Sequence, residues 1–65
     1  MDDIEILKAK RSGDVYIILA HIPDNAVTPW ATWLSTTITG EKRWSGRYFF
    51  DDEEQHAHDD FDYRA

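Results

Sequence analysis

The chain has 65 residues, of which 42% are apolar, no cysteine and a formal net charge of −6. A chain of this length forms one domain with a small core, and its apolar content is too high for a disordered protein. The lack of cysteine excludes disulfides and thiolate zinc sites, so we expect the core, an oligomer interface or a non-thiolate ligand to stabilise the fold.

The net charge is concentrated in one part of the chain. Residues 1–50 carry equal numbers of cations and carboxylates, whereas residues 51–65 carry seven carboxylates and one arginine. No basic segment followed by an apolar run opens the sequence, and the longest apolar stretch, residues 15–20, is too short to cross a bilayer. We therefore expect a soluble cytoplasmic protein with no membrane partner.

Residues 4–11 and 14–22 predict a β-hairpin closed by Ser12 and Gly13, because glycine accepts the positive φ of a two-residue turn. In this register Arg11 faces Asp14. Both sides of the hairpin are apolar, which is typical of strands covered on both faces. One side would carry Ile4, Ile6, Val15, Ile17 and Leu19, and the other Leu7, Tyr16, Ile18, Ala20 and Ile22.

Residues 23–29 begin and end with proline and predict a loop. Residues 30–38 and 42–50 then predict a second hairpin, which turns at residues 39–41. Successive side chains of a strand point to opposite sides, so this hairpin has two faces. The expected core face consists of Ala31, Trp33, Trp44, Gly46, Tyr48 and Phe50. The opposite face would carry Trp30, Thr32, Leu34, Arg43, Arg47 and Phe49.

After Phe50 the pattern changes to the period of a helix, with Asp51 as the predicted cap and Glu54 completing a capping box. Its apolar stripe would consist of Phe50, Ala57, Phe61 and Ala65, with Phe61 packed on Trp33, Trp44 or Tyr48. The predicted fold is a single α+β domain over residues 1–65. Two hairpins form a small antiparallel sheet of about four strands, and one C-terminal helix packs on one sheet face.

Two histidines of the predicted helix are candidate metal ligands. His56 with Asp60, and His58 with Asp62, have the i,i+4 spacing that lets two helical side chains share an ion. Each pair supplies two ligands only, so a metal site would need Glu54 or His21 to be brought close by the fold. We predict no metal and no cofactor.

Catalysis is not indicated either. Ser12, Ser35 and Ser45 lie in strand or turn contexts without a nucleophile elbow, and a chain this short has little means of enclosing a substrate. We predict no catalytic residue and no enzymatic activity.

Two binding hypotheses remain, and they differ in the sign of the charge at the contact. The leading one is a regulatory or inhibitory protein-binding module. Its acidic helix would attract a basic partner or imitate a phosphate backbone, or its open sheet face would bind a partner protein. The predicted contact residues are Asp52, Glu53, His56, Asp59, Asp60 and Tyr63. The alternative is a binder of single-stranded nucleic acid that uses one basic and aromatic sheet face, with Trp30, Arg43, Arg47 and Phe49.

The same fold also predicts self-association. One helix can cover only one face of a four-stranded sheet, so the other apolar face should need a partner. We expect a homodimer that packs sheet faces together or joins sheet edges.

Overall fold

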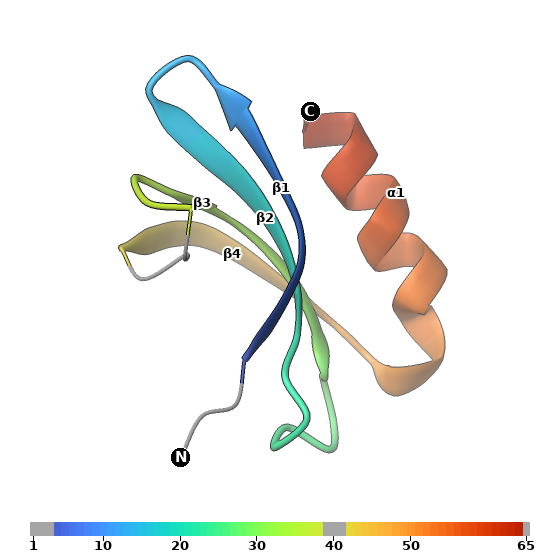
Figure 1. The fold of residues 1–65 in the computed structure, drawn as a ribbon. Coiled ribbons are helices and arrows are strands. Elements are labelled where there is room, and N and C mark those ends of the chain that lie inside the picture. The colour runs from blue at the N-terminus through green and yellow to red at the C-terminus, as the bar shows by residue number, and fades with distance from the viewer. Residues whose placement is uncertain (1–3, 39–41, 65) are drawn as a thin grey trace.

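The computed structural model describes residues 4–38 and 42–64, which form a twisted antiparallel sheet with a helix on one side (Figure 1). The elements are β1 (Glu5–Ser12), β2 (Val15–His21), β3 (Trp30–Ser35), β4 (Arg43–Phe49), a 3-10 turn (Asp51–Glu53) and α1 (Glu54–Arg64). The order in the sheet is β1-β2-β3-β4. The predicted α+β fold class is therefore confirmed. The predicted turn at residues 39–41 and the predicted stripe residue Ala65 lie outside the described residues.

The first hairpin turns one residue later than its sequence predicts. Ser12 pairs with Val15, so the turn consists of Gly13 and Asp14, and Arg11 pairs with Tyr16 instead of Asp14. Gly13 has a φ of 62° at the first central position, where a type II′ turn favours glycine. The predicted turn at Ser12 and Gly13 would have placed the glycine second.

Two bulges change which side chains share a face. In β1 the register shifts between Ile6 and Lys8, so Ile6 pairs with Ala20, where the unbroken Ser12–Val15 register would give His21. In β4 the shift falls beside Ser45, which has a φ of 57°. One extra residue moves every following side chain to the other face. Ile4 and Ile6 therefore lie opposite their predicted side.

The bulge in β4 exchanges two further residues between the faces. Trp44 pairs with Leu34, and Arg43 pairs with Ser35. Trp44 thus shares a face with Leu34 instead of Trp33, while Arg43 shares a face with Trp33. Both predicted placements are wrong, because an inserted residue has no signature in the alternation of the sequence.

We call the side of the sheet that faces α1 the helix face. Its core consists of Ile17, Leu19, Ala57 and Phe61, with Trp30, Leu34 and Phe49 packed around it. The predicted burial of Phe61 is confirmed, but it packs in the core with Ile17 and Leu19, and this core does not include Trp33, Trp44 or Tyr48. Phe50 is 57% exposed and lies outside the predicted stripe.

Among the described residues, no helix has the length and apolarity needed to cross a membrane.

We call the other side the open face, because no element covers it in Figure 1. Its core consists of Ile18, Ala20, Ala31 and Trp33, with Ile4, Tyr16 and Ile22 packed around it. Each of the four core side chains is at most 1% exposed, so neighbouring side chains bury them without a second layer. The two alanines need little cover, and the Arg43 guanidinium lies 4.5 Å from the ring centre of Trp33. The expectation that this core would need a partner is therefore wrong.

Candidate functional site

The start of α1 is fixed by backbone and side-chain bonds around Glu53. The Phe50 N–H donates to Oε1 of Glu53 at 2.9 Å, and the Glu53 N–H donates to the Phe50 carbonyl at 2.8 Å. Glu53 therefore completes the capping box, a role that the sequence predicts for Glu54. Asp51 lies in the 3-10 turn and does not cap the helix through its side chain. Trp30 Nε1 donates to the Asp51 carbonyl at 3.0 Å, which ties this turn to β3.

Glu53 also contacts His56, whose Nδ1 lies 3.2 Å from Oε2. The hydrogen bond from the Phe50 N–H, assisted by His56, lowers the pKa of Glu53 despite some desolvation. The acidic residues of this first turn also lie at the positive end of the helix dipole, where carboxylates are favoured.

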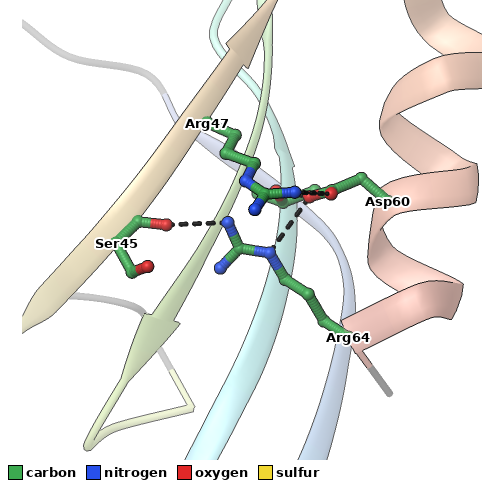
Figure 2. A network of polar contacts seen from close by, with 5 residues as sticks. Ser45, Arg47, Asp60 and Arg64 are labelled. Atoms are coloured by element: carbon green, nitrogen blue, oxygen red, sulfur yellow. Dashed lines mark hydrogen bonds and ion pairs between the residues drawn. The ribbon is translucent and has the colours of Figure 1, made fainter.

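Asp60 holds α1 to the β4 side of the sheet (Figure 2). Its Oδ1 lies 2.6 Å from Nη1 of Arg47, and its Oδ2 accepts from Thr32 Oγ1 and, at 3.0 Å, from Nε of Arg64. Arg64 also donates to the Ser45 carbonyl at 2.8 Å. We call this set the Asp60 network. Its side chains come from β3, β4 and α1, so it fixes the orientation of the helix on the sheet.

The side chain of Asp60 is only 10% exposed, so the prediction that it belongs to an exposed acidic face is wrong. Burial alone would raise its pKa. The hydrogen bonds from Thr32 and Arg47, together with the charges of Arg64 and Arg47, outweigh burial and hold the pKa of Asp60 below its ordinary value. The carboxylate is thus neutralised locally and contributes little to the field outside the molecule.

Apart from Glu53, the remaining carboxylates of the 3-10 turn and α1 are exposed to solvent. We define the outer acidic surface by its exposed members, which are Asp51, Asp52, Glu54, Asp59, Asp62 and Tyr63. Tyr63 belongs to the same surface, and it is 86% exposed to solvent. Of the predicted contact residues, Asp52, His56, Asp59 and Tyr63 are exposed, whereas Glu53 is half-buried. The structure therefore brings most of the predicted helix set together on one surface.

A groove runs between α1 and β1 on the side away from the Asp60 network. It has a volume of about 540 Å³ and is lined by Lys8, Asp52, Glu54, Gln55, His58 and Asp62. The Lys8 ammonium lies 5.8 Å from the ring centre of Phe61, and His58 Nε2 lies 3.6 Å from Glu54 Oε2. This groove was not predicted from the sequence. The four-residue spacing of Glu54, His58 and Asp62 could have indicated it, because residues four apart lie in one row along a helix.

The sheet residues predicted to bind nucleic acid do not gather on one accessible face. Trp30, Arg47 and Phe49 lie on the helix face, and Arg43 lies on the open face. Trp30 stacks on His21 with ring centres 4.4 Å apart, and Phe49 packs on the helix-face core. Arg47 is committed to Asp60. Three of the four predicted residues therefore support the docking of α1.

The histidines have nearby carboxylates but form no larger cluster. His56 contacts Glu53, and Asp60 binds Arg47. The side chains of His56 and Asp60, which have the i,i+4 spacing, therefore bind different partners. Within residues 4–38 and 42–64, no three histidine or carboxylate side chains converge on one point.

Comparison of the chain with protein-family models, with curated proteins and with solved structures found no match.

Proposed function

We propose that this protein is a small protein-binding module that engages a basic partner through the outer acidic surface of α1. The observation that carries the proposal is the division of the helix carboxylates into two groups. Asp60 is buried against two arginines, whereas five other carboxylates are exposed. The Asp60 network carries a net charge of +1, against −5 for the exposed carboxylates, so the outer acidic surface keeps a negative field.

Such a surface attracts a basic partner before contact, which raises the association rate. Tyr63 adds a large exposed ring to this surface, and tyrosine is enriched among the residues that dominate binding energy at protein interfaces. The groove beside β1 offers room for a lysine or arginine side chain next to Glu54 and Asp62. A partner that binds nucleic acid would use the same basic surface for phosphates, so binding here would be inhibitory. A cytoplasmic location is part of the same proposal.

The test compares two triple variants of equal net charge. Asp52→Asn, Asp59→Asn and Asp62→Asn neutralise the helix, while Glu5→Gln, Asp14→Asn and Asp24→Asn neutralise three acids elsewhere. With an arginine-rich peptide as the probe, we expect the helix variant to slow association at low salt by about tenfold or more, and the control variant to slow it much less. Stopped-flow measurements at several salt concentrations check this.

Exposed carboxylates contribute little to stability, so both triple variants should keep the melting temperature of the wild type to within a few degrees. Equal slowing by the two triple variants would show that overall charge, not the helix surface, controls association, and would overturn the proposal.

We also propose a homodimer, for which the edge of β1 offers two exposed apolar side chains. Ile6 and Leu7 are 37% and 42% exposed there. The bulge and the lysines of β1 oppose extension of the sheet through this edge, so we expect side-chain contact instead of a continuous sheet. Sedimentation equilibrium at micromolar concentration should give a dimer that Leu7→Lys dissociates. A wild-type monomer across the concentration range would contradict this.

A further inference from the structure

The open face carries a row of polar and aromatic side chains that crosses all four strands. Arg11 pairs with Tyr16, Tyr16 with Ser35, and Ser35 with Arg43. Adjacent strands lie about 4.8 Å apart, so the two arginines are separated by roughly 14 Å across the sheet. Directly paired residues share a face, and the row therefore places a cation at each end of the open face.

Both arginines are exposed at the surface of the open face. The guanidinium of Arg43 lies over the Trp33 ring, a cation–π contact that orders an exposed side chain. Arg11 donates Nε to the Gly13 carbonyl at 3.1 Å, which leaves its terminal amino groups available. Among the residues that the structure describes, neither arginine forms an ion pair. The charge of this row is therefore free to meet an anion.

Tyr48 provides an exposed ring on the same face. A Cβ atom at Gly46 would lie 3.4 Å from Cε2, 3.8 Å from Cζ and 3.7 Å from Oη of Tyr48, so the ring lies over the glycine. The residue is nevertheless 52% exposed. A ring that covers the backbone with one side and meets solvent with the other can stack a planar group.

A shallow hollow of about 440 Å³ connects this ring to the row. Tyr48, Arg43, Ile4 and Ile22 line it, together with the loop residues Asp24, Asn25 and Ala26. Asn25 is occupied within its loop, where its Oδ1 accepts from the N–H groups of Val27 and Thr28. The side chains left for a ligand are thus an aromatic ring, a guanidinium and two isoleucines, with Asp24 at the rim.

We propose that the open face binds single-stranded nucleic acid, with a base stacked on Tyr48 and phosphates contacted by Arg43 and Arg11. Exposed rings on a sheet stack unpaired bases, and guanidinium groups bind phosphates. A duplex keeps its bases stacked inside and presents none to Tyr48. The outer acidic surface lies on the far side of the sheet, so its field does not face the incoming strand.

This site is independent of the proposed protein-binding surface, and it differs from the nucleic-acid face predicted from the sequence. Of that predicted set, Arg43 alone belongs to it. The bulge at Ser45 is the structural cause, because it carries Arg43 to the side of Trp33 and Tyr48.

The test measures fluorescence anisotropy of labelled oligothymidylate and oligouridylate at low and moderate salt. Duplex DNA of the same length and inorganic polyphosphate serve as competitors. We expect the single strands to bind and the duplex and polyphosphate to compete poorly. Tyr48→Leu should weaken binding by about tenfold, whereas Tyr48→Phe, which keeps the ring, should bind as the wild type does.

Arg43→Gln and Arg11→Gln should each reduce the slope of log affinity against log salt by about 0.7, the value for one phosphate contact on a single strand. The matched control is Lys10→Gln, which removes a cation of β1 on the helix face and should leave the slope unchanged. Circular dichroism of each variant confirms that it is folded.

Three results would overturn the proposal. They are no binding of single strands at low salt, equal loss of affinity from Lys10→Gln and Arg43→Gln, and unchanged affinity in Tyr48→Leu. The triple variant of Asp52, Asp59 and Asp62 separates the two proposed functions. It should associate more slowly with the arginine-rich peptide but bind oligothymidylate as the wild type does.

Discussion

Replacing Phe61 with alanine should leave little of the protein folded at room temperature. Phe61 is 6% exposed and packs with Ile17, Leu19 and Ala57 as the largest side chain of the helix-face core. Truncating a buried phenylalanine costs about 3–5 kcal/mol, which is close to the whole stability that a core of this size supplies. Urea denaturation followed by far-UV circular dichroism measures the loss.

The control for this substitution is Tyr63→Ala, which removes an aromatic side chain two residues away that is 86% exposed. It should change the free energy of unfolding by about 0.5 kcal/mol or less. If Phe61→Ala changes the free energy of unfolding no more than Tyr63→Ala does, then α1 is not docked through Phe61.

Asp60→Asn should have the second largest effect, because it removes the charge at the centre of the Asp60 network without changing the shape of the side chain. Arg64, which is 11% exposed, would be left near the sheet without a counter-charge. Removing one partner of a largely buried ion pair leaves the other charge uncompensated, and we expect a loss of about 2–3 kcal/mol. Asp59→Asn changes the preceding, exposed residue and should be nearly neutral.

The same network predicts how stability depends on pH. The pKa of Asp60 in the folded protein lies below its ordinary value of 3.8, so its contribution is fully present above that value and is lost as the pH falls through the folded pKa. The melting temperatures of wild type and Asp60→Asn should therefore differ most near neutral pH and converge in acid. Glu53, whose pKa is also lowered, adds a slope of the same sign that Glu53→Gln should remove. Parallel pH profiles for wild type and Asp60→Asn would contradict the role assigned to Asp60.

The hairpins, the helix and the burial of Phe61 could be predicted from the sequence because each depends on local pattern. Two-residue periodicity, a glycine in a turn and a change to helical periodicity are visible within short windows. The bulges at Ser45 and between Ile6 and Lys8 could not be predicted, since one extra residue leaves composition and periodicity almost unchanged. Each bulge reverses the faces predicted beyond it. The helix also packs on the face opposite to Trp33 and Tyr48, which share the open face as predicted, so the bulges do not explain that error.

The candidate site was predictable to the extent that its residues are neighbours in sequence. Asp52, Asp59 and Tyr63 are exposed on one helix, as expected from the helical period. Asp60 was assigned to the same surface because a carboxylate is usually solvated. Its partners Thr32 and Arg47 come from other elements, and only the strand pairing brings them to it. The i,i+4 spacing to Arg64 was the one local sign of the network.

The order β1-β2-β3-β4 has a consequence for how the chain folds. Each strand pairs with its neighbour in sequence, and the helix docks last in chain order. The strand pairs therefore form between neighbours in sequence, whereas the contacts of α1, such as that of Asp60 with Thr32, join parts of the chain that are far apart in sequence. α1 is joined to the sheet by one small core and the Asp60 network, so its transient detachment would remove the core that stabilises the sheet. Each detachment would expose Ile17 and Leu19 to solvent, and the buried carboxylate that orients the helix also limits how often this happens.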